Sequence, residues 1–434
     1  MYPLRPVRAY TLDAVARNPA SFARMKRILR ALGLSMGDVI PINRKNVYEV
    51  ALELLAWPML PLSSDCPAQH QRPLVFTNIV TNRIQKEDPW LANRPPDIRN
   101  QMVRHILGRM PLTQRVYRRN PRRDSNVVCW KSLDFCVMSG CPHGCHYCVF
   151  GKWGSFITLG LNIEEYMDKV VGPTIEKNPS QKCFGIIGPA ADVITFEPEY
   201  GAFAAFLRKL SQYEGRYGYF HTSSDNVGWV AKVPHRDRLI GVWSITSEAV
   251  AQIIEPGSPP ALRRIQAARQ CQDLGVPIRF KFKPVVPLRN WREEYAHTIK
   301  AVFKHTRPES VGFCVVMWMD LDELKNRIDL DLLDPSFVNE AEKAKEKLKG
   351  RMTGPFPHHV RAEIYRFLIR EVRRWDKKIP VFISTESREM WDELTGVLGQ
   401  NPRAFICGCN PIQLPGPRLA FSRRLSSSTY AAGK

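Results

Sequence analysis

Three cysteines in one short loop are the residues of this 434-residue chain whose types and spacing best suit chemistry. Cys141, Cys145 and Cys148 lie within eight residues, and thiolates this close together can bind a single metal centre. Structural zinc takes four ligands, usually as two separated pairs; His143 or His146 could supply the fourth, but no matching Cys/His pair follows. An iron–sulfur cluster, whose ordinary ligation is four cysteines, would instead keep one iron open to another ligand. That open iron is where chemistry can occur.

The other eight of the 11 cysteines indicate no disulfide framework. The total is odd, and Arg5, Arg8 and Arg17 leave no room for the apolar core of a secretory signal. Cys407 and Cys409 flank one glycine and are interpreted as a structural turn; the alternative is a second metal site that recruits Cys314 or Cys271. The single cysteines are expected to be small buried hydrophobes: Cys66, Cys129, Cys136, Cys183, Cys271 and Cys314.

The loop resembles the signature of the radical S-adenosylmethionine (SAM) enzymes, which is C-x3-C-x2-C with an aromatic residue before the last cysteine, here Tyr147. The resemblance implies that Cys141, Cys145 and Cys148 hold a 4Fe–4S cluster. It further implies that the amino and carboxylate groups of SAM chelate the fourth iron and that Tyr147 lies near the adenine. A reducing electron donor such as flavodoxin or ferredoxin would be a partner.

Beyond the loop, strand and helix patterns alternate, which predicts an α/β fold of βα units around a parallel sheet. With the resemblance, we expect a partial (β/α)6-type TIM-like radical SAM barrel. Active sites on such barrels lie at the C-terminal ends of the strands, where the cysteine loop would follow its first strand. The predicted strands are Cys183–Ile187, Gly218–Thr222, Leu239–Ser244, Ile278–Val285 and Ser310–Val316, and the predicted helices are Ile163–Val171, Tyr200–Tyr213, Pro260–Leu274 and Trp291–Lys304.

The chain is expected to divide into four segments. Residues 1–125 would form a basic N-terminal extension, helical or irregular, with helices at Thr11–Leu34, Asn46–Trp57 and Pro96–Leu107. Residues 126–320 would form the barrel core and residues 321–421 a C-terminal α/β extension. Residues 422–434 are rich in Ser, Ala and Gly and would be a flexible tail.

Several segments narrow the resemblance to the spore photoproduct lyase family, which repairs a thymine–thymine adduct in DNA. The matching stretches, strongest over 140–300, are Gly140–Cys148, Asn162–Glu165, Trp243–Ser247, Ile254–Ser258, Ala267–Arg269 and Trp291–Glu293. By this resemblance Ser244 and Thr246 would line the SAM site, and Arg238 would lie near the cofactor. From the residues alone, a Ser-x-Thr pair could equally cap the next helix, and Glu255-Pro256-Gly257 could be a turn.

Two departures from that family bear on the reaction. The lyases place a hydrogen-donating cysteine just beyond the second barrel strand, close to an aspartate; Asp192 fits, but the cysteine position falls at about Pro189. Residues 155–162 contain no tyrosine, although the lyases relay a hydrogen atom through tyrosine in this region. An enzyme without these donors should quench a substrate radical poorly, whereas an isomerase can recover its hydrogen from deoxyadenosine. We therefore prefer a resemblance to the phage radical SAM enzymes that rearrange an amino-acid adduct on the thymine methyl group.

A formal net charge of +21 indicates affinity for a polyanion. Five arginines crowd a nine-residue segment before the barrel and are the predicted DNA contacts, with Tyr117 interleaved to stack on a base: Arg115, Arg118, Arg119, Arg122 and Arg123. A weaker second candidate is formed by Trp318, Trp375, Arg373, Arg374, Lys377 and Lys378. The bland alternative is a solvated basic linker. No apolar run is long enough to span a membrane, so we expect a cytoplasmic protein, in the host cytoplasm if it is viral.

The chemistry expected from the resemblance is one-electron cleavage of SAM to a 5′-deoxyadenosyl radical, which abstracts a hydrogen atom from a thymine derivative in DNA. The first hypothesis is an isomerase that rearranges an amino-acid adduct during thymidine hypermodification, and the alternative is a repair lyase of the spore photoproduct type. A radical SAM enzyme acting on RNA, a peptide or a small molecule also stays open. The alternative from another class is a zinc-bearing DNA-binding protein without catalysis.

Overall fold

An eight-stranded sheet forms the centre of the computed structural model, which describes residues 1–57, 59, 62–82, 95–115, 127–130, 132–148, 156–187, 191–409, 411–416 and 420–421. The strand order is β14-β13-β12-β11-β10-β9-β6-β4. Neighbouring strands from β6 to β14 are parallel, and only β4 is antiparallel to its neighbour. The bounds are Thr113–Arg115 (β4), Leu133–Phe135 (β6), Cys183–Ile186 (β9), Tyr217–Thr222 (β10), Leu239–Ile245 (β11), Ile278–Val285 (β12), Val311–Val315 (β13) and Val381–Ile383 (β14).

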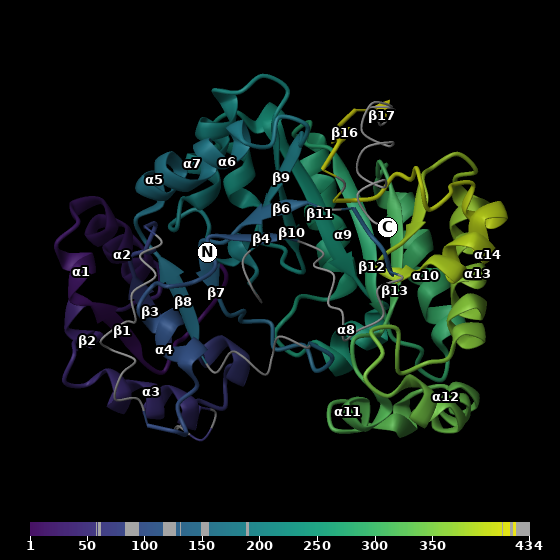
Figure 1. Ribbon diagram of the computed structural model, residues 1–434, viewed down its shortest axis with the longest axis horizontal. Coiled ribbons are helices and arrows are strands. Elements are labelled where there is room, and N and C mark those ends of the chain that lie inside the picture. Colours follow the sequence, from purple (N-terminus) through teal and green to yellow (C-terminus); the bar gives the residue numbers. More distant parts are fainter. Residues whose placement is uncertain are drawn as a thin grey trace.

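The sheet is an open, partial barrel, because β4 and β14 are edge strands that do not pair with each other in the described structure. Helices follow the parallel strands and cover the outer face of the sheet (Figure 1). These helices are Ala202–Ser211 (α7), Glu248–Ile254 (α8), Ala261–Asp273 (α9), Trp291–His305 (α10) and His358–Trp375 (α13). The predicted α/β fold and partial barrel are thus confirmed. Except for the helix predicted from Ile163, the ends of every predicted strand and helix in this region lie within two residues of the observed ends.

Alternation along each strand gives the sheet two chemically different faces. On β12, Phe280 and Phe282 pack among aromatic rings of the outer core, such as Trp243 and Tyr295. Lys281 lies on the other face, where its strand neighbour in register is Ser244 of β11. We call the face opposite the helices the inner face.

The N-terminal strands β1, β2 and β3 join β8 and β7 in a second, five-stranded sheet in the order β2-β1-β3-β8-β7. Strands β1, β2, β3 and β8 are parallel, and β7 is antiparallel to β8. The cysteine loop lies in the sequence between β7 and β8, so it connects two paired strands of this second sheet. The bounds are Ala9–Leu12 (β1), Val39–Ile42 (β2), Leu74–Thr77 (β3), Met138–Ser139 (β7), Ile157–Gly160 (β8), Asp13–Ala16 (α1), Pro19–Ala31 (α2), Val47–Ala56 (α3) and Asn100–Ile106 (α4).

The segment predicted as a single helix over Thr11–Leu34 differs from the prediction. Its first residues belong to β1, and a break at Arg17 and Asn18 separates α1 from α2. Two tertiary features override the helical spacing: β1 is paired on both sides by β2 and β3, and the Asn18 side chain caps α2 by accepting from the Ser21 backbone N–H, with Pro19 in the first turn. Likewise, the helix predicted from Ile163 continues through α5 (Ile163–Tyr166), a π-helical turn (Met167–Val171) and α6 (Gly172–Glu176).

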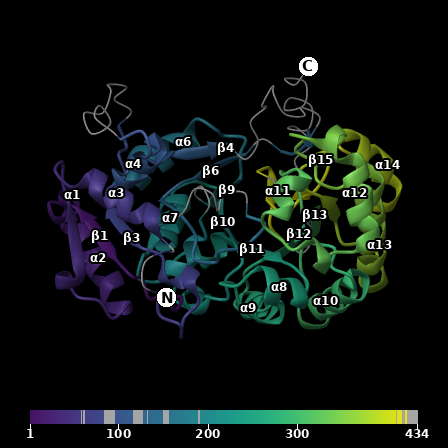
Figure 2. The same cartoon turned by 90° about the horizontal axis from the view of Figure 1, so that it is seen from below.

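The C-terminal residues extend the same large sheet, since β14 pairs with β13. Figure 2 shows the N-terminal sheet and the C-terminal helices on opposite sides of the central strands. Within the described residues, no helix is both long and apolar enough to cross a membrane. The remaining elements are Val127–Val128 (β5), Leu321–Lys325 (α11), Pro335–Leu348 (α12), Glu386–Ser387 (β15), Arg388–Leu398 (α14), Gln413–Leu414 (β16) and Ala420–Phe421 (β17).

Candidate active site

The cysteine loop leaves β7 and is held by arginines that bind its backbone. The Arg72 Nη1 donates to the Cys141 carbonyl oxygen at 2.6 Å, and the Arg327 Nη1 donates to that of Cys148 at 2.7 Å. The backbone N–H of Cys148 in turn donates to the Cys145 carbonyl at 3.0 Å. Arg72 lies just before β3 and Arg327 just after α11, so both arginines come from outside the barrel strands. Together they hold the two ends of the three-cysteine segment.

The middle of the loop docks on Gly257, which follows α8. The Gly257 carbonyl oxygen is contacted by the Tyr2 hydroxyl (2.9 Å), the His70 Nε2 (3.0 Å) and the His143 Nδ1 (2.9 Å). Its N–H donates to the His143 carbonyl at 2.9 Å. A Cβ at this position would lie 2.6 Å from the carbonyl oxygens of both Pro142 and His143, so only glycine allows this close approach. The Glu-Pro-Gly stretch is therefore a turn that also seats the cysteine loop.

His143 ties the loop to the carboxyl end of β9. Its Nε2 lies 3.0 Å from the Asp192 Oδ2, and its ring is buried. Asp192 also accepts from the Thr222 hydroxyl at 2.8 Å and from the Ser223 N–H at 2.9 Å. Since both ring nitrogens of His143 face oxygen acceptors, neither is available to a metal without breaking this network. His143 thus positions the loop, which disfavours it as a fourth zinc ligand.

Glu255 is a second anchor, next to the SAM-binding residues that the sequence predicts. Its carboxylate accepts hydrogen bonds from the Tyr147 hydroxyl and from the Arg264 guanidinium. The Thr246 hydroxyl lies 3.4 Å from the same carboxylate. Arg264 and Glu255 are almost fully buried, so this is an ion pair shielded from water. Tyr147 and Thr246, which the sequence predicts at the cofactor, are therefore brought together by one carboxylate.

The three thiols have the chemical character of metal ligands in a protected loop. All of the chain's described cysteines are free. Burial raises the pKa of Cys141 well above its usual value and that of Cys145 to about 12. Such thiols are protonated at neutral pH, so a metal centre would displace their protons on binding. The buried Arg72 guanidinium lies within electrostatic range of all three thiols, and its Nε has no hydrogen-bond partner in the described structure.

A cationic side chain beside the thiols would offset the negative charge of a thiolate-bound cluster. In the described residues, however, no set of three His, Cys, Asp or Glu side chains is already arranged around a common metal position. The fit to a cluster therefore rests on the donor set and on the arginine beside it, and the three thiols must draw together on binding.

The structure separates the other predicted cofactor residues. Ser244 lies on the inner face, where its hydroxyl is 2.9 Å from the His221 Nε2. Arg238 lies in the turn before β11, paired with Asp237 at 3.3 Å and stacked over Tyr217. The seven residues of β11 put roughly 20 Å between its two ends. Arg238 is therefore at the amino end of the strand, and the structure does not bring it to the cysteine loop.

The predicted DNA contacts lie mostly outside the described residues. Arg115 ends β4, and only its backbone is described; Arg118, Arg119, Arg122 and Arg123 lie outside the described residues. In the weaker candidate, Arg373 uses its guanidinium to cap backbone carbonyls at Ile379 (2.7 Å) and Leu398 (3.1 Å). That arginine therefore serves the fold. The arginine segment stays a prediction.

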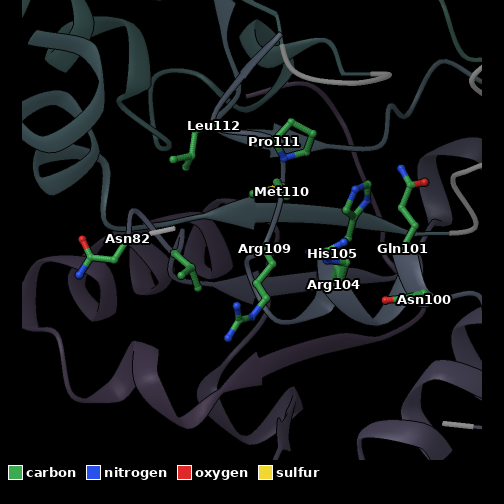
Figure 3. A pocket seen from close by; sticks show the side chains of 10 residues that line it. Asn82, Asn100, Gln101, Arg104, His105, Arg109, Met110, Pro111 and Leu112 are labelled. Atoms are coloured by element: carbon green, nitrogen blue, oxygen red, sulfur yellow. The ribbon is translucent and has the colours of Figure 1, made fainter. Parts of the chain in front are cut away.

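A polar pocket of about 590 Å³ lies next to the start of that arginine segment (Figure 3). His105 in its wall is buried, and its Nδ1 is 3.1 Å from the hydroxyl of Ser139, the last residue of β7. Its Nε2 has no partner in the described structure, and burial lowers the His105 pKa to about 4, so the ring is neutral at pH 7. The polar lining residues are Asn82, Asn100, Gln101, Arg104, His105 and Arg109. Sequence reasoning did not find this pocket, because its residues, although all between positions 80 and 112, follow no recognisable motif.

Sequence reasoning also missed Tyr2, His70 and Arg72 as supports of the cysteine loop. They come from the N-terminal residues, and no local pattern marks them. Their roles depend on contacts across 69 or more residues, such as that of Arg72 with Cys141.

Comparison with known proteins agrees with this geometry. Residues 132–318 match the family described as spore photoproduct lyase. A 162-residue segment is 25% identical to the spore photoproduct lyase of Bacillus subtilis (strain 168). This segment covers 37% of this chain and 47% of that protein. The matched part thus spans about half the length of that relative.

The fold is also that of spore photoproduct lyase. A structure of the lyase complexed with dinucleoside spore photoproduct has a TM-score of 0.59 at 13% identity, covering 88% of this chain and 98% of that chain. A variant of that lyase with bound AdoMet and the same dinucleoside has a TM-score of 0.58 at 13% identity, with the same coverage. The chain is therefore similar to spore photoproduct lyase in sequence over residues 132–318, and it shares the fold of that lyase over most of its length.

Proposed function

We propose that this protein is a radical SAM enzyme that rearranges a modified thymine in DNA. Cys141, Cys145 and Cys148 would hold the 4Fe–4S cluster, with SAM on the fourth iron. When bound, this pair supplies a 5′-deoxyadenosyl radical for hydrogen abstraction. The observation that carries the proposal is the loop itself, in which three thiols lie within eight residues. The loop is anchored at Gly257 and Asp192 over the carboxyl ends of the strands, where α/β barrels place their active sites.

The residues around the loop have separable roles in this proposal. Arg72 and Arg327 hold the loop backbone and place positive charge beside the cluster. Glu255 orients Tyr147 for contact with the adenine. Ser244 would contact SAM from the inner face. Arg238 has no part, because it lies at the other end of β11.

DNA as substrate is supported by the net charge of +21 and by the likeness to lyases solved with a dinucleoside photoproduct. Isomerisation is favoured over repair by the sequence after β9, which places Pro189 where the lyase family is expected to have its hydrogen-donating cysteine. A repair lyase is the second candidate, favoured by the family match over residues 132–318.

Anaerobic reconstitution tests the cofactor assignment. We expect about four irons and four sulfides per chain, with cleavage of SAM to 5′-deoxyadenosine under reduction. Cys141→Ala should lose both, while the matched control Cys66→Ala, outside the loop, should lose neither. Colourless protein that contains zinc would instead support the non-catalytic, zinc-bearing alternative.

The substrate is tested by mass spectrometry of nucleosides from DNA of cells that express the protein, with and without Cys141→Ala. A modified thymidine that changes structure at constant mass supports an isomerase. Restoration of two thymidines from a photoproduct supports a repair lyase. An unchanged nucleoside profile would count against DNA as the substrate.

A further inference from the structure

Two lysines of β12 bring positive charge to the inner face of the barrel. Lys281 and Lys283 are two residues apart on one strand, so they lie on the same face, opposite the outer-core rings of Phe280 and Phe282. Charged side chains on the inner face of a sheet are costly unless something compensates them. The charged and polar groups around each ammonium therefore indicate whether its charge is compensated within the fold.

Lys281 already has a partner from the C-terminal segment. Its Nζ donates to the Cys409 Sγ at 3.0 Å, and the side chain is almost fully buried. The turn that carries Cys409 is held by the Arg279 Nη1, which donates to the Gly408 carbonyl at 3.0 Å. The hydrogen bond with the Cys407 thiol and the charge of the Lys281 ammonium lower the Cys409 pKa well below its usual value, which favours an anionic sulfur beside the ammonium. Lys281 is thus neutralised within the fold.

Lys283 has no such compensation in the described residues. It is half-buried and forms no ion pair with any described carboxylate. The groups that influence it electrostatically are the Lys281 ammonium and the sulfurs of Cys129, Cys314 and Cys409. Burial, together with the charge of Lys281, lowers its pKa below the usual value. An ammonium group that keeps some access to solvent but lacks a counter-ion is suited to bind an anion.

Trp318 covers this ammonium group. The Lys283 Nζ lies 4.5 Å from the centre of the Trp318 ring, within the range of a cation–π contact. Trp318 has a φ of 67°, a backbone conformation that a bulky residue rarely adopts. Its N–H donates to the Met352 carbonyl at 2.9 Å, which holds the strained residue in place. The tryptophan therefore offers a flat apolar surface immediately beside the positive charge.

The pair lies on the same side of the sheet as a residue already assigned to the active site. His221 of β10 is within electrostatic range of Lys281 and Lys283, and its Nε2 is 2.9 Å from the Ser244 hydroxyl. Ser244 is in turn the register partner of Lys281 on adjacent strands. The Lys283 ammonium therefore lies on the same face as Ser244, which is predicted to contact SAM, and it takes no part in anchoring the cysteine loop at Gly257 and Asp192.

We propose that Lys283 and Trp318 form a specificity site for a carboxylate carried by the substrate base, with the ammonium binding the carboxylate and the indole packing on the adjoining ring. This inference rests on the proposed function and makes it narrower, because it requires an anionic substituent such as the carboxylate of an amino-acid adduct. An unsubstituted thymine dimer offers no carboxylate at its ring. A DNA phosphate and the SAM carboxylate are the other sources of the same chemistry, and the experiment below separates them.

The test measures binding of two synthetic hexanucleotides to the reconstituted holoenzyme by calorimetry. One carries a glycine joined through nitrogen to the thymine methyl group, and the other carries its neutral glycinamide. A hydrogen bond to a charged group favours the acid by about tenfold or more. Lys283→Met should remove this preference, Lys283→Arg should keep most of it, and the exposed Lys304→Met should leave it unchanged.

Three other outcomes would overturn the assignment of Lys283 to a substrate carboxylate. If Lys283→Met weakens an unmodified hexanucleotide as much as the acid, the ammonium binds a phosphate. If it weakens SAM binding instead, the ammonium binds the SAM carboxylate. If wild type shows no preference for the acid, or Lys283→Met and Lys283→Arg both retain it, no carboxylate site exists there. A Lys283-dependent preference in a protein that does not cleave SAM would leave the site intact and refute only the proposed function.

Discussion

The ion pair between Glu255 and Arg264 gives the sharpest test of the site's architecture. The exposed fractions of the two side chains are 1% and 0%. Glu255→Gln keeps the shape of the side chain but leaves the Arg264 charge buried without its counter-ion. Removing one partner of a buried pair costs about 3–5 kcal/mol of unfolding free energy. We expect the loss to fall in this range, because Arg264 retains only carbonyl acceptors at Pro259 (2.8 Å) and Ser244 (3.4 Å).

The expected change in melting temperature follows from the size of the chain. An unfolding entropy of about 2.1 cal/mol/K per residue gives about 0.9 kcal/mol/K for a chain of 434 residues. Glu255→Gln should therefore lower Tm by about 3–6 °C, measured by calorimetry at pH 7. Because the pair is shielded from water, the shift should persist at high salt.

Two further variants decide whether the ion pair is the cause. The double variant Glu255→Gln with Arg264→Met should lose less than the sum of the single variants, since no charge is left buried alone. The matched control is Glu340, which is one-third exposed and is paired with Lys343 at 2.7 Å and with His359 at 3.1 Å; Glu340→Gln should shift Tm by less than about 1 °C. Additive losses in the double variant, or a shift for Glu255→Gln no larger than the control, would refute the reasoning.

Three other outcomes follow from the structure. Gly257→Ala should lower the iron content after reconstitution while far-UV circular dichroism stays unchanged, because the added Cβ would meet two loop carbonyl oxygens at 2.6 Å; full iron occupancy would contradict this. Burial raises the pKa of Asp134 to about 7, so the folded state holds its proton up to that pH while the unfolded state releases it near its usual value of about 3.9. The stability that Asp134 contributes is therefore lost as pH rises from about 4 to 7, and the Tm of Asp134→Asn relative to wild type should climb over that range and level off above it; a constant difference would contradict the assignment. DNA affinity should fall by roughly 10³–10⁵-fold between 50 and 200 mM salt if six to ten phosphates are contacted, and Arg118→Gln in the arginine segment predicted to bind DNA should reduce the salt slope by about one unit; an unchanged slope would place the DNA elsewhere.

Local sequence patterns were sufficient for the parallel sheet. The strand over Ile278–Val285 was predicted with its observed bounds, because Ile278, Phe280 and Phe282 alternate with basic residues in the two-residue period of a strand. The N-terminal sheet was not predicted, since the helical spacing after Thr11 outweighed the short strand Ala9–Leu12. That strand is stabilised by pairing with Val39–Ile42 on one side and Leu74–Thr77 on the other. The hydrophobic periodicity of the sequence does not reveal such pairing.

The sequence by itself identified the candidate metal-binding residues and the class of chemistry that they would support, because Cys141, Cys145 and Cys148 are close in the chain and their spacing is a local property. Only the tertiary structure decided which distant groups support them. It brought Gly257 and Asp192 to His143, left Arg238 at the far end of its strand, and placed Lys283 beneath Trp318 without a described counter-ion. The physical reason is that burial and charge compensation depend on neighbours in space, and a chain's order reveals those neighbours only where a local motif forces them together.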